Sequence, residues 1–86
     1  MNIEEFINKI EAEFPDLQKG VLKPETRFRD EVEWDSINAL VIIAMINIEY
    51  DVTITAEELI NAETVQDVYD IVEKKVLENK EKETDA

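Results

Sequence analysis

A stretch of twelve residues without a charged side chain, residues 37–48, constrains the fold of this 86-residue chain more than any other feature. Asn38 and Asn47 interrupt the stretch, and it is much shorter than the ~20 apolar residues that span a bilayer. It is longer than a typical strand, and a serine, Ser36, stands directly before it as a helix-start signal. The sequence therefore predicts a buried or half-buried helix from Ser36 to about Tyr50.

The composition limits the chemistry that one small domain can carry. The chain has no cysteine and no histidine, which excludes disulfides, thiolate metal sites and the commonest general base. Without a histidine to activate Ser36 as a nucleophile, we expect no enzymatic activity and no catalytic residue. The acidic N-terminus lacks the pattern of a signal peptide, and no stretch is long enough to span a membrane. We expect a cytoplasmic monomer.

Acidic residues dominate the charge, and the formal net charge is −13. Twelve Asp and Glu residues lie between Asp30 and Glu73 without one Lys or Arg, so binding to nucleic acid is excluded. Such a field attracts basic partner surfaces, and repulsion within it is expected to raise carboxylate pKa values. Four of these acids precede Ser36, but their spacing and the missing glycine do not fit an EF-hand loop, so we expect no metal site.

Apolar spacing and capping signals predict three further helices. Apolar residues recur at three- and four-residue spacing after Asn2 and after Thr64, and Thr55 with Glu58 forms a capping box. The four predicted helices span residues 2 to about 14, 36 to about 50, 55 to about 61 and 64 to about 77. A long connection that holds the only glycine and both prolines separates the first two.

The predicted fold class is all-α. It is a four-helix bundle of three longer helices and one short helix, with a long loop between helices one and two. One helical domain is expected to occupy residues 1–77. Residues 78–86 are almost all polar, and we expect them to form a charged, frayed tail.

The second helix is apolar on nearly every side. One broad face is the candidate for the core and consists of Ala39, Leu40, Ile42, Ile43, Ile46 and Tyr50. The opposite side consists of Ile37, Val41, Ala44, Met45 and Ile48. A helix of this kind is either fully buried or presents an apolar surface to a partner, and full burial is hard to arrange in so small a domain. Both possibilities stay open, because the long loop could cover part of this side.

Four short motifs, in order along the chain, resemble those of the acyl carrier proteins and related phosphopantetheine-binding carrier domains. The motifs are Pro24-Glu25-Thr26-Arg27-Phe28, Asp35-Ser36-Ile37, Tyr50-Asp51-Val52 followed by Ile54, and Thr64-Val65-Gln66-Asp67. The second motif corresponds to the Asp-Ser-Leu tripeptide that opens a long helix in this family. The resemblance extends from Ile3 to about Val76. It departs from the family where Glu33-Trp34 replaces the glycine that usually precedes the Asp-Ser pair.

The resemblance implies that Ser36 carries a covalent 4′-phosphopantetheine group and that Asp35 flanks the attachment site. A phosphopantetheinyl transferase would transfer the group from coenzyme A. The thiol of the arm would then hold acyl or aminoacyl groups as thioesters for acyl-activating, acyltransferase or condensing enzymes. This import of a thiol is consistent with a chain that has no cysteine.

The second helix also departs from fatty-acid carriers, which usually display acidic residues there to meet basic partner enzymes. We therefore expect a specialised pathway outside core fatty-acid synthesis, with partners that dock on this helix. The predicted docking residues are Ile37, Asn38, Val41, Met45 and Ile48. The alternative function is an unmodified helical adaptor that docks partners through the same helix, with Ser36 serving only as an N-cap.

Overall fold

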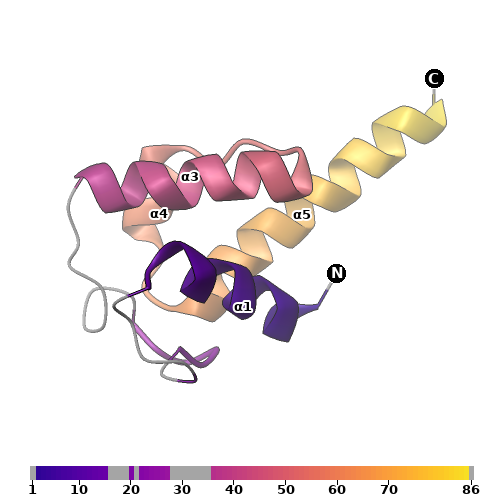
Figure 1. Cartoon of the computed structure of the whole chain (residues 1–86). Coiled ribbons are helices and arrows are strands. Elements are labelled where there is room, and N and C mark those ends of the chain that lie inside the picture. Colours follow the sequence, from indigo (N-terminus) through magenta and orange to yellow (C-terminus); the bar gives the residue numbers. More distant parts are fainter. Residues whose placement is uncertain (1, 16–19, 21, 28–35, 86) are drawn as a thin grey trace.

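Four helices make up the fold in the computed structural model, which describes residues 2–15, 20, 22–27 and 36–85 (Figure 1). They are α1 (Ile3–Glu13), α3 (Ser36–Tyr50), α4 (Ala56–Asn61) and α5 (Val65–Asp85). The described residues contain no β-strand; they contain one isolated antiparallel bridge, between Arg27 and Thr64. The predicted all-α fold, with one short helix and a long connection after the first helix, is confirmed.

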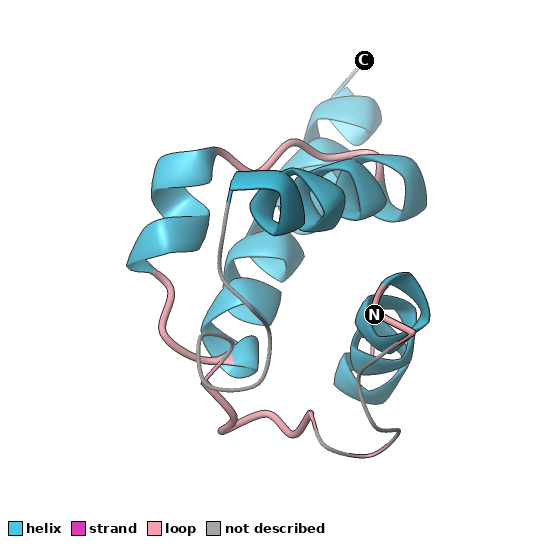
Figure 2. Ribbon diagram, turned by 60° about the vertical axis from the view of Figure 1, so that its left-hand side comes forward, coloured by secondary structure: helices cyan, strands magenta, loops and turns pink. Residues whose placement is uncertain are grey.

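The helix α3 packs against each of the other three helices. In Figure 2, α3 and α5 occupy the middle of the bundle, with α1 on one side and α4 on the other. The core contains only apolar side chains and Tyr69, and no charged residue is buried in the described chain. The segments between helices also contribute, because Leu22, Val52 and Ile54 are almost fully buried. The extended segment after α3 is therefore part of the core.

Local capping sets where α1 and α4 begin. The backbone N–H groups of Glu4 and Glu5 donate to Oδ1 of Asn2 at 2.8 and 3.4 Å. At α4, the N–H of Glu58 donates to Oγ1 of Thr55 at 3.1 Å, and the N–H of Thr55 donates to the Glu58 carboxylate at 3.0 Å. These side chains satisfy donors that the first helical turn leaves without partners, so both predicted starts are confirmed.

The start of α5 is tied to the chain segment that precedes α3. The N–H groups of Val65 and Gln66 donate to the carbonyl oxygens of Thr26 and Pro24 at 3.0 and 2.9 Å. These backbone bonds hold residues 24–27 against the N-terminal end of α5. The connection between α1 and α3 is thus anchored to the bundle part-way along its length.

The helix α5 is longer than the sequence predicts. We expected a frayed tail from residue 78, whereas the structure continues α5 to Asp85, and its last turns extend beyond the other helices (Figure 1). The residues concerned are mostly Glu and Lys, and their high helix propensity favours continuation of the helix. Near this end, Nδ2 of Asn79 donates to the carbonyl oxygen of Asp51 at 3.1 Å and fastens α5 to the end of α3. The limit of the folded domain at residue 77 stays a prediction.

Candidate functional site

Ser36 is the first residue of α3, and this end of the helix lies at the edge of the bundle (Figure 1). The residue before this helix start, Asp35, lies outside the described residues. Free backbone N–H groups and the positive end of the helix dipole favour a phosphate at such a position. The next side chain, Ile37, is 69% exposed, so solvent reaches this end of the helix. The backbone geometry thus fits a phosphodiester at residue 36.

The two faces of α3 differ sharply in burial. Ile42 and Ile46 are fully buried, as predicted, and Met45 is buried with 4% of its surface exposed. Leu40, in contrast, is 62% exposed. The predicted orientation of α3 is therefore wrong for Leu40 and Met45, which exchange sides. The physical reason is that a helix apolar on every side can be buried at several rotations, and the packing of the neighbouring helices selects one of them.

The predicted docking residues do not form one exposed surface. Ile37 and Ile48 are exposed, at 69% and 79%, but Asn38 and Val41 are only partly exposed. Met45 belongs to the core, so its predicted place in a docking surface is withdrawn. The exposed apolar line along α3, called the α3 stripe below, consists of Ile37, Leu40, Ala44 and Ile48. Sequence reasoning placed Leu40 in the core, although the spacing of these four residues is that of one helical face.

An ion pair links the C-terminal end of α3 to α1. Nζ of Lys9 lies 3.1 Å from the Glu49 carboxylate and 3.5 Å from that of Glu5. The same ammonium lies 5.0 Å from the centre of the Tyr50 ring, in cation–π geometry. The hydrogen bond to Glu49 is the main cause that raises the pKa of Lys9. The one acid of α3 is therefore already paired within the protein.

The family of the chain follows from its sequence match. The model of the family described as "Phosphopantetheine attachment site" matches residues 5–72, which is most of the chain. The chain belongs to this family. Its members carry phosphopantetheine and are carrier proteins, not catalysts, so the expected absence of enzymatic activity agrees with the family. Membership of the family implies that this carrier interacts with a phosphopantetheinyl transferase and with acyl-handling enzymes.

Individual proteins support the same assignment. The acyl carrier protein of Buchnera aphidicola subsp. Acyrthosiphon pisum (strain Tuc7) is 34% identical over 76 residues, covering 88% of this chain and 95% of that protein. The acyl carrier protein of Thermosynechococcus vestitus is 32% identical over 79 residues, covering 88% and 98%. The solution structure of holo acyl carrier protein from Geobacter metallireducens aligns with a TM-score of 0.75 at 26% identity, covering 92% of this chain and 90% of that one.

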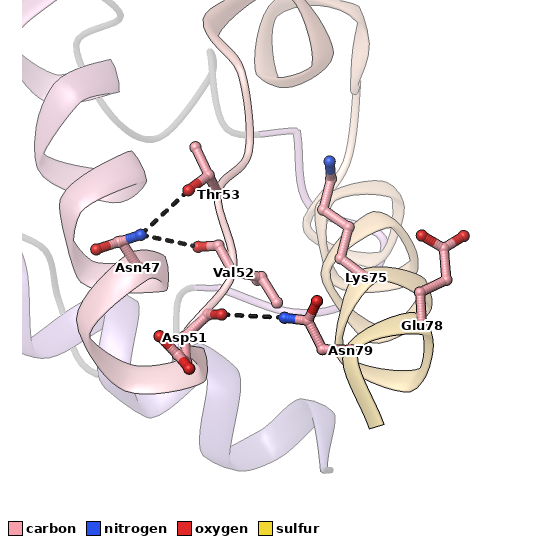
Figure 3. A pocket seen from close by; sticks show the side chains of 7 residues that line it. All are labelled: Asn47, Asp51, Val52, Thr53, Lys75, Glu78 and Asn79. Atoms are coloured by element: carbon pink, nitrogen blue, oxygen red, sulfur yellow. Dashed lines mark hydrogen bonds between the residues drawn. The ribbon is translucent and has the colours of Figure 1, made fainter. Parts of the chain in front are cut away.

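The carrier also has a polar hollow of about 410 Å³ at the C-terminal end of α3 (Figure 3). Its lining residues are Asn47, Asp51, Val52, Thr53, Lys75, Glu78 and Asn79. Nδ2 of Asn47 donates to the Val52 carbonyl at 3.4 Å and to the Thr53 hydroxyl at 3.2 Å. Asp51 has a φ of 56°, the left-handed conformation that ends many helices. The hollow lies at the opposite end of α3 from Ser36, and the role of Asn47 there is to hold the turn.

The pKa values of two carboxylates of the carrier are lowered, whereas repulsion between acidic residues was expected to raise them. The backbone N–H of Thr55, which donates to Glu58, is the main cause that lowers the pKa of Glu58. The backbone N–H groups of Glu63 and Thr64, at 3.1 and 3.2 Å, likewise lower the pKa of Asp67. Hydrogen bonds at the helix starts therefore outweigh the surrounding negative charge at these two groups.

In the described part of the chain, no three Asp, Glu, His or Cys side chains are grouped closely enough to hold a metal ion. No helix in the same part is both long and apolar enough to cross a membrane. The acidic cluster directly before Ser36 lies outside the described residues.

Proposed function

We propose that this protein is an acyl carrier in which Ser36 holds the 4′-phosphopantetheine group, with Asp35 flanking the attachment site. The observation that carries the proposal is that Ser36 opens α3 inside the region that matches the family. Ser36 is also the only serine of the chain. A helix start supplies the N–H groups and the dipole that favour a phosphodiester at this residue.

The transfer that loads the carrier can be written with all atoms balanced. The hydroxyl oxygen of Ser36 forms a bond to the β-phosphorus of coenzyme A and loses its proton to the transferase or to solvent. The bond from this phosphorus to the bridging oxygen breaks, and 3′,5′-adenosine diphosphate leaves. When bound, the arm supplies the thiol on which acyl or aminoacyl groups are carried as thioesters. The chain itself contributes no thiol, since it has no cysteine.

We infer a pathway other than core fatty-acid synthesis. From Ser36 to Ile48, α3 presents no carboxylate, and Glu49 is paired with Lys9. A partner that recognises acidic side chains along this helix would find none there to bind. This supports the sequence-based expectation of a specialised carrier. The cytoplasmic location and the monomeric state also stay predictions.

The test of the proposed site is intact-mass analysis after incubation with coenzyme A and a broad-specificity phosphopantetheinyl transferase. We expect a gain of one phosphopantetheinyl group in the wild-type protein and no gain in Ser36→Ala. Thr53→Ala is the matched control, because it removes the hydroxyl of an exposed residue in the segment after the C-terminal end of α3 and should leave the gain intact. A gain that persists in Ser36→Ala would place the attachment elsewhere.

The second candidate function is an unmodified helical adaptor that docks partners through α3. The exposure of Ile37, Leu40 and Ile48 favours it, since exposed apolar side chains in a row are typical of contact surfaces. The same mass experiment separates the two functions. A folded wild-type protein that gains no phosphopantetheinyl group would support the adaptor and refute the carrier.

A further inference from the structure

We propose that the contact between residues 24–27 and the start of α5 positions the chain that leads to Ser36 for the transferase, and that Thr26 is the positioning residue of this contact. The inference rests on the proposed function, because it assumes that Ser36 is the residue that is modified. It assigns a role to two of the four sequence motifs, the one that begins at Pro24 and the one that begins at Thr64, which attachment at Ser36 does not explain by itself.

The start of α5 receives its hydrogen-bond acceptors from the preceding chain. The first turn of a helix leaves N–H groups that have no acceptor within the helix. Val65 and Gln66 donate two such groups to the carbonyl oxygens of Thr26 and Pro24, at 3.0 and 2.9 Å. Residues 24–27 therefore satisfy donors that a capping side chain would otherwise satisfy, and they lie beside the first turn of α5 (Figure 1). The two motifs are thus joined through backbone bonds.

Thr26 holds residues 24–27 in shape through its bonds to Lys23. The N–H of Thr26 donates to the carbonyl oxygen of Lys23 at 3.0 Å, and Oγ1 of Thr26 accepts the N–H of Lys23 at 2.9 Å. Pro24 occupies the second position of this turn, where proline is favoured. Because the carbonyl oxygens of both Pro24 and Thr26 accept bonds from α5, loss of the Thr26 hydroxyl is expected to loosen the turn and the contact together.

The contact also shortens the stretch of chain that leads to Ser36. Eight residues separate Arg27 from Ser36, whereas 13 separate Ser36 from the buried Leu22. A shorter stretch between two held points has fewer possible arrangements than a longer one. An enzyme that binds one arrangement of the chain at Ser36 finds it in a larger fraction of molecules when the contact is formed, and its apparent affinity is higher in proportion. Loss of the contact should therefore raise KM and leave the transfer step unchanged.

The experiment compares two threonines whose hydroxyls have the same local role. Oγ1 of Thr26 accepts the N–H of Lys23 at 2.9 Å, and Oγ1 of Thr55 accepts the N–H of Glu58 at 3.1 Å, each three residues away. The measurements are kcat and KM for modification of Ser36 by the broad-specificity transferase with coenzyme A. We expect Thr26→Ala to raise KM for the carrier about fivefold, the lower end of typical couplings between sites, and to change kcat by less than about twofold. Thr55→Ala should leave both constants unchanged, although it removes a helix cap and lowers stability.

Hydrogen exchange of the Val65 and Gln66 amides reports on the contact itself. Both amides should exchange faster in Thr26→Ala, whereas Thr26→Ser keeps the hydroxyl and should restore the exchange rates and the KM of the wild-type protein. Faster exchange with an unchanged KM would overturn the proposal, and so would an equal rise of KM in Thr55→Ala, because loss of stability alone would then explain the effect. Unchanged exchange in Thr26→Ala would also overturn it, because the hydroxyl would not hold the contact. Failure of the wild-type protein to be modified at all is a different result, which refutes the proposed function itself.

Discussion

The rotation of α3 about its own axis can be tested with two alanine substitutions on the same helix. Met45 is 4% exposed and belongs to the core with Ile42 and Ile46, whereas Leu40 is 62% exposed. Both side chains are unbranched at Cβ and have helix propensities close to that of alanine. The change in propensity is therefore small for both variants, and burial is the main difference between them.

The structure gives a clear difference in the expected free energies of unfolding. Truncation of a buried methionine to alanine costs about 2–5 kcal/mol, because apolar contacts are lost and a cavity remains. An exposed substitution usually changes stability by within about 0.5 kcal/mol. A domain of 86 residues has a total stability of roughly 4–13 kcal/mol. Met45→Ala should therefore remove a large part of it and lower Tm by roughly 10 °C or more, while Leu40→Ala should change Tm by a few degrees at most.

The assay is urea denaturation followed by far-ultraviolet circular dichroism, with the free energy taken from the linear extrapolation. Equal slopes for the variants and the wild-type protein would show that the comparison is between similar folded and unfolded states. If Leu40→Ala cost as much as Met45→Ala or more, α3 would be rotated relative to the structure described here. The stripe would then be part of the core, and the proposed docking surface would be refuted.

Three further predictions concern charge and the buried hydroxyl group of Tyr50. The folded pKa values of Glu58 and Asp67 lie below their unfolded values, so the stability that these groups contribute is present at neutral pH and is lost as pH falls below about 4. Melting curves recorded at several pH values should show Tm falling below about pH 4, and this fall in Tm should be smaller in Glu58→Gln. Burial raises the pKa of Tyr50, and its hydroxyl has no hydrogen-bond partner in the described structure, so Tyr50→Phe should be neutral or stabilising by up to about 1 kcal/mol in urea denaturation. A larger loss would mean that the hydroxyl has a partner. Added sodium chloride at neutral pH should raise Tm, because it screens the repulsion among the twelve acids between Asp30 and Glu73, and a constant Tm would contradict this.

The helix starts could be predicted because their signals are local. Asn2 and the Thr55–Glu58 pair cap the helices they were expected to cap, and the contacts involved span two or three residues of sequence. The C-terminal extent of α5 could not be predicted in the same way. The polar residues after Leu77 indicated a tail, yet α5 continues to Asp85, consistent with their helix propensity and with the hydrogen bond from Asn79 to the carbonyl of Asp51.

The orientation of α3 shows where sequence periodicity stops being informative. An amphipathic helix reveals its buried side because polar residues mark the other one, as the capped and strongly patterned α1 does. In α3 the apolar residues surround the axis, so Leu40 and Met45 are equally good core candidates by sequence, and contacts with α1, α4 and α5 decide between them. The same property leaves Leu40 and its neighbours in the stripe exposed and apolar, a surface that stability of the isolated fold does not require. A contact with partner enzymes beside Ser36 would explain why these positions hold Ile and Leu instead of the charged residues that solvent would favour.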